Sequence, residues 1–440
     1  MSDPAIDIVR RHALPLDAVT GLHQVIDLIG DARLVLLGEA SHGTHEFYRV
    51  RADITRELVA HHGFNLVAVE ADWPDAYRAC RWTTPAGADA TAEEALADFT
   101  RFPRWMWRNT VVVDFLRWLR EWNAGRPPQV GAAFYGLDLY SLHRSIECVL
   151  QYLKKVDPDA ARLARERYSC FDVYGEDVQA YGYATSFGLS KSCENDVVAQ
   201  LVDLRQRATD YATRDGRIAA DDYFVAEQNA RVVRNAEVYY RAMFRGGVES
   251  WNVRDQHMMS TLEALLAHVS RTNGEARAVV WAHNSHLGDA RATSMATRGE
   301  LNLGQLTRQR FANQCRLVGF TTHAGTVTAA SNWDEPAERM VVRPSAPGSY
   351  ERLFHEVGLP AFLLPLTNPD LRAALIQPRL ERAIGVIYRP DTERASYYFN
   401  ARLSQQFDAV IHIDTTSAVK PLETWSRHEV DLPETYPSGV

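Results

Sequence analysis

The feature that most constrains the fold is a series of short, continuous apolar runs, each lying near a segment with helical periodicity. The runs are rich in Val, Leu, Ile and aromatic residues and do not alternate with polar positions. This pattern is typical of strands in a parallel sheet that helices cover on both faces. We therefore predict an α/β fold with a mixed, largely parallel central sheet flanked by helices. The predicted strands are 33–39, 65–70, 133–138, 278–283, 317–322, 362–364, 383–388 and 410–414.

A long helical stretch separates the third and fourth of these strands. Across 144–269 the apolar residues recur at helical spacing, as in Val232, Ala236, Tyr239 and Met243, and no run resembles a strand. We interpret this stretch as a helical insertion that packs on the sheet and forms one lobe of a single functional unit. The α/β core then comprises 1–143 and 270–425, and the whole chain, 1–440, forms a single functional unit.

The charge balance argues against broad binding to nucleic acid or to anionic membranes. The 440 residues contain 48 Lys and Arg against 56 Asp and Glu, a net charge of −8. Duplex binding usually relies on excess cations that release counterions from phosphates. The sequence also has no uninterrupted apolar run of about 18 residues, the length that a membrane-spanning helix needs. We expect a small-molecule substrate and no nucleic-acid or membrane partner, and the sequence leaves the oligomeric state open.

The cysteines point to a reducing compartment. They are odd in number, far apart and never arranged as C-x-x-C, so neither a zinc knuckle nor a thioredoxin motif is present. The expectation is free, mostly buried thiols in the cytoplasm. The residues concerned are Cys80, Cys148, Cys170, Cys193 and Cys315.

Ionisable residues end four of the predicted strands. They are Glu39, Glu70, Asp138 and His283. In open α/β sheets the ligand crevice lies outside the carboxyl ends of the strands. Carboxylates and imidazoles that meet there shift each other's pKa and can transfer protons. A charged residue at one strand end is ordinarily just solvated, but four together indicate a site.

The first of these strand ends is also the densest in polar residues, within the sequence GEASHGTHE. We expect Gly38 and Gly43 to provide the backbone freedom of a tight strand-to-helix turn. Ser41 or Thr44 can cap the helix that follows. Ser41 lies in G-E-A-S-H rather than in the G-x-S-x-G of a nucleophile elbow, so we do not expect it to be a nucleophile.

Two further segments complete the polar set. The helix predicted over 44–62 carries Arg51 about two turns from its start, and a long side chain leaning toward the helix N-terminus can reach the crevice. At the other strand end, Asn284 and Ser285 separate His283 from His286. The chain contains no H-E-x-x-H, Walker A or G-x-G-x-x-G sequence. The simplest sequence evidence for a zincin, a P-loop enzyme or a Rossmann dehydrogenase is therefore missing.

These segments resemble the erythromycin esterase family, which also includes chains labelled succinoglycan biosynthesis protein-like. The likeness extends over roughly 26–422, and the GE-x-SHG turn paired with WAHN-x-H is its most specific part. The resemblance implies metal-independent hydrolysis of an ester or macrolactone without a cofactor, on a mixed α/β core with a helical lobe. Carried over by position, the family's functional residues are Glu39, His42, Arg51, Glu70, His283 and His286. The segments that carry the likeness are GEASHGTHEFYRVRADITRELV, LVAVEADW and VVWAHNSHLGD, with FPRWMWRN, FYGLDLYSL, RDQHMM, PGSYERLFHEVG and GVIYRPDTERASYYFNARLSQQFDAVIHID.

In the role that the resemblance implies, His42 is the general base that activates water. Glu39 and Glu70 orient and polarise the imidazoles or position the water. These roles agree with the chemistry, because a base within hydrogen-bond reach of water and a carboxylate on the far imidazole nitrogen are what such a step requires.

The remaining carried-over residues act on the substrate side. Arg51 and His283 contact the substrate carbonyl or stabilise the oxyanion, and His286 helps to position water or a neighbouring group. The substrate itself does not follow from the motif. The aromatic segment 102–107, with Trp118 and Trp122, could line an apolar cleft, although an aromatic stripe is by default part of the core.

Three alternatives remain open from the sequence. A metalloenzyme could gather Glu39, His42, Glu70, His283 and His286 around Zn²⁺ or Mn²⁺. The same site could instead run acyl transfer, dehydration or ring closure in natural-product biosynthesis. The third alternative is a non-catalytic binding protein that retains the fold, which the intact polar set argues against.

Overall fold

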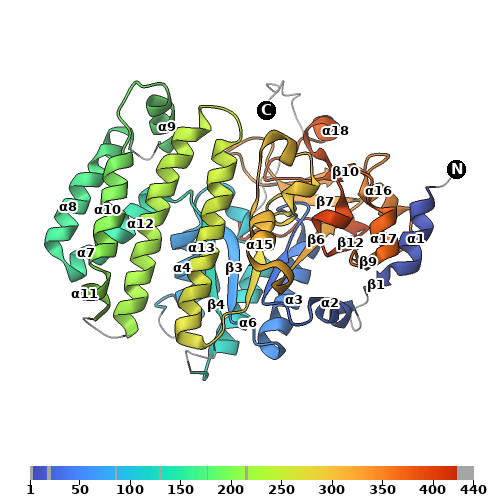
Figure 1. Ribbon diagram of the computed structural model, residues 1–440, viewed down its shortest axis with the longest axis horizontal. Coiled ribbons are helices and arrows are strands. Elements are labelled where there is room, and N and C mark those ends of the chain that lie inside the picture. Colours follow the sequence, from blue (N-terminus) through green and yellow to red (C-terminus); the bar gives the residue numbers. More distant parts are fainter. Residues whose placement is uncertain are drawn as a thin grey trace.

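A mixed eight-stranded sheet forms the centre of the computed structural model, which describes residues 3–16, 21–84, 87–127, 131–175, 177–213 and 217–423 (Figure 1). The strand order is β1-β9-β12-β6-β2-β5-β3-β4. The six strands from β12 to β4 are parallel to one another, whereas β9 is antiparallel to both β12 and β1. The predicted fold class, mixed and largely parallel, is confirmed. The bounds are β1 (Leu14–Pro15), β2 (Leu34–Leu37), β3 (Leu66–Asp72), β4 (Ala133–Asp138), β5 (Ala278–Trp281), β6 (Cys315–Thr321), β9 (Ala361–Pro365) and β12 (Ala409–Ile413).

The strand predictions match seven of the eight strands of the central sheet, because the two-residue strand β1 was not predicted, and they are wrong outside this sheet. Each predicted run except 383–388 overlaps a strand of this sheet. The run 383–388 makes only isolated bridges. Ile384 pairs with Ser41 and Ile387 pairs with Ala330, so the run contacts two different segments and does not extend along either one. Two small sheets were missed, since their strands are half-exposed and lack continuous apolar runs. They contain β7 (Ala324–Ala329), β8 (Glu338–Val342) and β13 (Thr415–Thr416), and β10 (Arg379–Arg382) and β11 (Tyr398–Ala401).

Helices surround the sheet, and two of them position the candidate site. The helix α3 follows β2 directly, and α13 packs along β3 and β4 (Figure 1). The apolar face of α13, which includes Met258, Leu262 and Leu265, is buried in the main core. The helix bounds are α1 (Pro4–His12), α2 (Gly21–Ile29), α3 (His45–His61), α4 (Trp73–Trp82), α5 (Ala92–Ala95), α6 (Thr110–Asn123), α7 (Leu142–Val156), α8 (Pro158–Tyr168), α9 (Val178–Ser186), α10 (Glu194–Gln206), α11 (Ala208–Thr213), α12 (Arg217–Met243), α13 (Glu249–Asn273), α14 (Asn284–Leu287), α15 (Leu303–Phe311), α16 (Tyr350–His355), α17 (Pro369–Ala374), α18 (Glu393–Ser396) and α19 (Leu403–Gln406).

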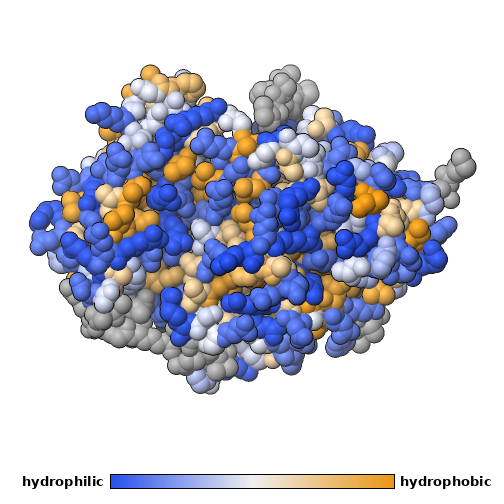
Figure 2. All heavy atoms as spheres, viewed as in Figure 1, coloured by the Kyte–Doolittle hydropathy of each residue, from blue (hydrophilic) through white to orange (hydrophobic). Residues whose placement is uncertain are grey.

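The helices α7 to α12 gather on one side of the sheet, at the left in Figure 1. They share an apolar cluster of their own, which includes Val149, Leu153, Val233 and Ala236. The division of the chain into a core and an inserted lobe stays a prediction. Figure 2 shows apolar side chains over α9 and the turn after it, where Tyr183, Phe187 and Leu189 are exposed. Among the helices of the described residues, none is both long enough and apolar enough to cross a bilayer.

The expectation of five free thiols is wrong for two of them. Cys170, in a short 3-10 helix (Ser169–Tyr174), forms a disulfide with Cys193, just before α10. The segment between them, which contains α9, brings the two Cα atoms to 5.9 Å although they are 23 positions apart in the sequence, and spacing alone could not reveal this. Cys80 and Cys315 are free and buried, and Cys148 is free and partly buried.

The two glycines of the first strand-to-helix turn serve close packing rather than the backbone freedom that we expected. Neither Gly38 nor Gly43 has a positive φ. A Cβ on Gly38 would overlap the side-chain oxygen of Asn284, and one on Gly43 would overlap the backbone carbonyl of Thr328. The turn is therefore held against β7 and against the segment after β5, which is why it tolerates only hydrogen at both positions.

Replacing Gly43 with alanine should lower the free energy of unfolding by about 3 kcal/mol, because the obstructing atom is backbone and the turn cannot move away easily. The Gly43 carbonyl also accepts hydrogen bonds from Thr328 N and Val419 N, at 3.0 and 2.8 Å, which any shift would strain. Urea unfolding measures the effect. Gly385→Ala is the matched control, since nothing lies within 4 Å of its Cβ position. Equal losses in the two variants would contradict the packing explanation.

Candidate active site

The predicted polar residues meet at the carboxyl ends of four adjacent strands, in the order β2-β5-β3-β4. Glu39 lies two residues after β2, and His283 two residues after β5. Glu70 lies inside β3, which runs further than predicted, and Asp138 is the last residue of β4. All four side chains are buried. The sheet thus brings together residues that are up to 244 positions apart in the sequence.

Glu39 links a histidine and an arginine. Its Oε1 lies 3.0 Å from Nδ1 of His42, and its Oε2 accepts a hydrogen bond of 2.5 Å from Nη2 of Arg51. Arg51 is 1% exposed, and its guanidinium lies between the rings of Tyr48 and Trp281. The long side chain does reach back to the turn, as its place on α3 allowed. Because the Glu39 carboxylate accepts a hydrogen bond from Nδ1–H of His42, Nε2 of His42 is left to accept a proton.

The start of α3 is held differently from our expectation. Thr44 occupies the N-cap position, but its hydroxyl makes no capping bond to the backbone. It contacts the hydroxyl of Ser41 instead, so neither residue caps the helix. Glu46, in the first turn, accepts hydrogen bonds from the backbone N and the hydroxyl of Ser417, at 2.8 and 2.7 Å. The polar residues of this turn therefore tie it to the segment after β12.

His283 faces His42, with 4.8 Å between the ring centroids. Its backbone N donates to Oε2 of Glu70 at 2.8 Å, and its Nδ1 accepts from the backbone N of Ser285 at 3.2 Å. The ring proton must then sit on Nε2. Burial, reinforced by the positive potential of His42, lowers the pKa of His283 far below its usual value. His283 is therefore a neutral donor, and its Nε2 has no hydrogen-bond partner among the described residues.

Glu70 remains an anion despite being buried. Burial acts to raise its pKa, but His286, Arg254 and His42 outweigh burial and lower the pKa below the usual range. The shortest contact is the 2.6 Å hydrogen bond that Arg254 Nη2 donates to Oε1. Asp138 receives the same guanidinium at 2.6 Å, which likewise outweighs burial and lowers its pKa.

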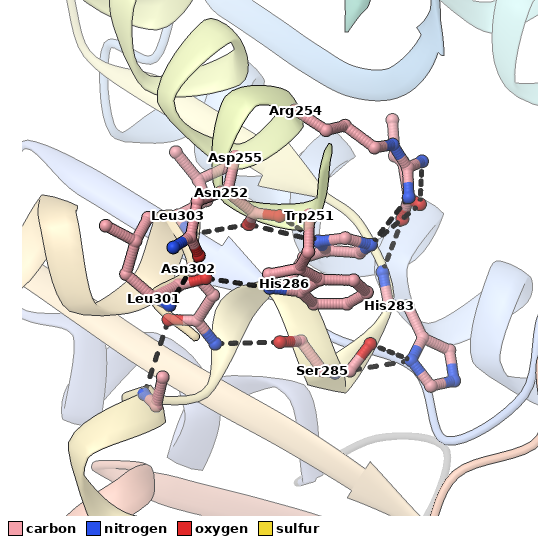
Figure 3. A network of polar contacts seen from close by, with 12 residues as sticks. Trp251, Asn252, Arg254, Asp255, His283, Ser285, His286, Leu301, Asn302 and Leu303 are labelled. Atoms are coloured by element: carbon pink, nitrogen blue, oxygen red, sulfur yellow. Dashed lines mark hydrogen bonds and ion pairs between the residues drawn. The ribbon is translucent and has the colours of Figure 1, made fainter. Parts of the chain in front are cut away.

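His286 is enclosed by three residues of α13 (Figure 3). Its Nδ1 lies 2.9 Å from a carboxylate oxygen of Asp255, and its Nε2 lies 2.9 Å from Nη1 of Arg254. The ring of Trp251 stacks on it with 4.5 Å between centroids. Burial disfavours the imidazolium, yet Asp255 and then Glu70 outweigh burial and raise the pKa of His286.

The sequence prediction missed these three residues, Trp251, Arg254 and Asp255. RDQHMM contributed to the family likeness, but no role was assigned to its charged pair. A signal was present, because Asp255 lies three and seven residues before Met258 and Leu262, on the apolar face of α13. A charge on a buried helix face needs a partner. Which partner it finds is a property of the tertiary fold alone.

The remaining predictions for the site concern metals and aromatic walls. Across the described ranges, no group of three or more His, Cys, Asp or Glu side chains is arranged to hold a metal ion. The oxygens of Glu39 and Glu70 are engaged by cations and N–H groups. Of the aromatic segment, Trp105 and Trp107 are buried in the main core, where an aromatic stripe belongs by default.

Comparison with known proteins places this site in a family. The family model described as erythromycin esterase matches residues 59–416. An erythromycin esterase type II of Escherichia coli is 22% identical over 405 residues, covering 89% of this chain and 91% of that protein. A solved succinoglycan biosynthesis protein, 20% identical, has a TM-score of 0.76 and covers 94% of this chain and 97% of its own. A solved erythromycin esterase mutant in its open conformation, also 20% identical, has a TM-score of 0.65, covering 90% and 93% of the two chains. The chain belongs to the erythromycin esterase family.

Proposed function

We propose that this protein hydrolyses a carboxylic ester, including the cyclic ester of a macrolactone, by means of water activated by His42 and without a metal. Family membership supports a hydrolase. The observation that carries the mechanism is the pairing of His42 Nδ1 with Glu39 at 3.0 Å. It fixes the tautomer in which Nε2 accepts a proton from water, and the Glu39 carboxylate stabilises the imidazolium that forms.

The facing histidine provides the electrostatic part of the mechanism. His283 is neutral and carries its proton on Nε2, so it can donate to a carbonyl oxygen that becomes negative as water attacks. Arg51 has two guanidinium nitrogens, Nε and Nη1, without a hydrogen-bond partner among the described residues. In this proposal Arg51 holds Glu39 and adds positive charge near the same oxygen.

The remaining carboxylate and imidazole support these groups. Glu70 fixes the backbone of His283 through the 2.8 Å hydrogen bond, and His286 lies 3.4 Å from the other oxygen of Glu70. Glu70 and His286 therefore position the donor rather than attack the substrate. This chemistry requires no serine nucleophile and no cofactor.

The direct test is a panel of macrolides, simple esters and lactones assayed with the purified wild-type protein, with and without a chelator. We expect hydrolysis of at least one ester class, unchanged by the chelator, and release of a free carboxylic acid that mass spectrometry detects. Metal analysis of protein purified without added metal runs alongside. Loss of activity on chelation, restored by Zn²⁺ or Mn²⁺, would favour the metalloenzyme, and a dehydrated or cyclised product would favour the biosynthetic alternative.

Replacing Ser41 with alanine should leave activity within about threefold of wild type. Its hydroxyl contacts Thr44, and the proposed nucleophile is water. The assay is turnover of the best substrate from the panel. A covalent acyl group found on Ser41 by mass spectrometry of the quenched reaction would contradict both this prediction and the water mechanism.

A further inference from the structure

Arg254 uses all three of its guanidinium nitrogens at the candidate active site. Its Nη2 donates to Glu70 Oε1 and to Asp138 Oδ2, both at 2.6 Å, and its Nε donates to Asp138 Oδ1 at 3.0 Å. Its Nη1 lies 2.9 Å from Nε2 of His286. The carboxylates come from two strands and the imidazole from α14, so one side chain of α13 joins three separate elements.

The contact between Arg254 and His286 determines where the imidazole proton lies. A guanidinium can only donate, so a 2.9 Å contact to Nε2 requires that nitrogen to be unprotonated. The ring proton then sits on Nδ1, toward Asp255. The carboxylates of Asp255 and Glu70 favour the imidazolium instead, but protonating Nε2 would set two donors against each other at 2.9 Å. The neutral imidazole with its proton on Nδ1 is therefore the form that this contact allows.

We propose that Arg254 is a positioning residue that holds Glu70 as an anion and His286 as a neutral imidazole. This role rests on the proposed hydrolysis only for its effect on reaction rates. The positions of the imidazole protons of His286 can be measured without a substrate. Through Glu70, Arg254 also fixes the backbone of His283, whose Nε2 faces the reaction. The guanidinium is thus connected to the proposed oxyanion donor by one carboxylate and two hydrogen bonds.

The shape of the group matters as well as its charge. A lysine ammonium is a single nitrogen and cannot span two carboxylates and an imidazole in one plane. Without the guanidinium, three buried carboxylates, Glu70, Asp138 and Asp255, would be left with His286 as the one group among these residues that can take up a positive charge. His286 should then take a second proton on Nε2, now free to turn toward Glu70 Oε1, 3.4 Å away.

The rate experiment compares Arg254→Ala and Arg254→Lys with Arg101→Ala. Arg101 is the matched control, because it pairs with Asp72 at the same edge of the sheet but does not touch Glu70 or His286. We expect both Arg254 variants to lose about 10- to 100-fold in kcat, less than the roughly 10²–10⁴-fold of a proton-transfer group. Arg101→Ala should stay within about threefold. Dilute guanidinium chloride, but not an equal concentration of sodium chloride, should restore activity to Arg254→Ala alone.

The second experiment determines which imidazole nitrogens of His286 carry a proton. It uses nitrogen NMR of protein whose histidines are labelled with ¹⁵N, and the His286→Gln variant assigns the signals. In wild type at neutral pH, His286 should show a protonated Nδ1 and an unprotonated Nε2, whereas in Arg254→Ala both nitrogens should be protonated. Thermal unfolding confirms that the variants are folded. An imidazolium in wild type, or the same neutral tautomer in both proteins, would overturn the proposal. If the wild-type protein hydrolysed no ester, the proposed function would be wrong. The NMR measurement would still test whether Arg254 keeps His286 neutral.

Discussion

Replacing His42 with alanine should reduce kcat/KM for the best ester substrate by roughly 10²–10⁴-fold, a loss of about 3–5 kcal/mol of transition-state stabilisation. The expectation follows from its position, since His42 is the imidazole held by Glu39 that faces the neutral donor His283.

The matched control for this prediction is His45→Ala. His45 lies three residues further on, at the start of α3, and its backbone N rather than its ring is held, by the carbonyl of Ser417 at 2.8 Å. Activity of this variant should stay within about twofold of wild type. If His42→Ala turned over the substrate at a rate near wild type, the water mechanism would fail even though the fold and family stand.

Replacing Glu39 with glutamine should lower both stability and activity. The carboxylate is 2% exposed and is the only ion-pair partner of the buried Arg51 within the described residues, so its loss leaves an uncompensated charge that costs about 3–5 kcal/mol of unfolding free energy. The glutamine side chain has one oxygen and one NH₂ group, and its neighbours His42 Nδ1–H and Arg51 Nη2 both donate hydrogen bonds. The NH₂ group must therefore face a donor, which disfavours the His42 tautomer with its proton on Nδ1. We expect the rate to fall by at least about 10²-fold for that reason.

Urea unfolding and turnover measure the two effects of Glu39→Gln separately. Glu46→Gln is the control, because Glu46 is only partly buried and bonds to Ser417 rather than to a cation. It should cost about 1 kcal/mol or less. Adding Arg51→Met to Glu39→Gln should recover part of the stability but none of the activity, since the buried charge is gone and the tautomer is still wrong. A Glu39→Gln protein as stable as wild type would contradict the ion-pair explanation.

The candidate site was predicted in outline because its residues lie at strand ends. In a parallel sheet, apolar runs mark the strands, and carboxyl ends of neighbouring strands share one edge. Glu39, Glu70 and His283 could therefore be placed together from the sequence, and Asp138 with them. The structure does bring these four together, while the catalytic roles assigned to them stay predictions.

The contacts that complete the site could not be predicted in this way. Arg254 and Asp255 come from a helix, and helical periodicity reports which face is buried but not which buried partner a charge meets. The two glycines of the first turn are a similar case. Glycine at these two positions indicated a special backbone conformation. A side chain is excluded at position 43, however, by the backbone carbonyl of Thr328, nearly three hundred residues away.

The sequence by itself determined the class of fold, the order of the strands along the chain and the strand ends that carry ionisable groups, because these follow from local apolar patterning. The tertiary structure alone decided the order of the strands in space, the disulfide between Cys170 and Cys193, and the partners that surround the imidazoles of His283 and His286. Those depend on contacts between distant segments, whose energies come from burial and hydrogen-bond geometry. The insertion of β5 between β2 and β3 is the clearest case, since it sets His283 opposite His42.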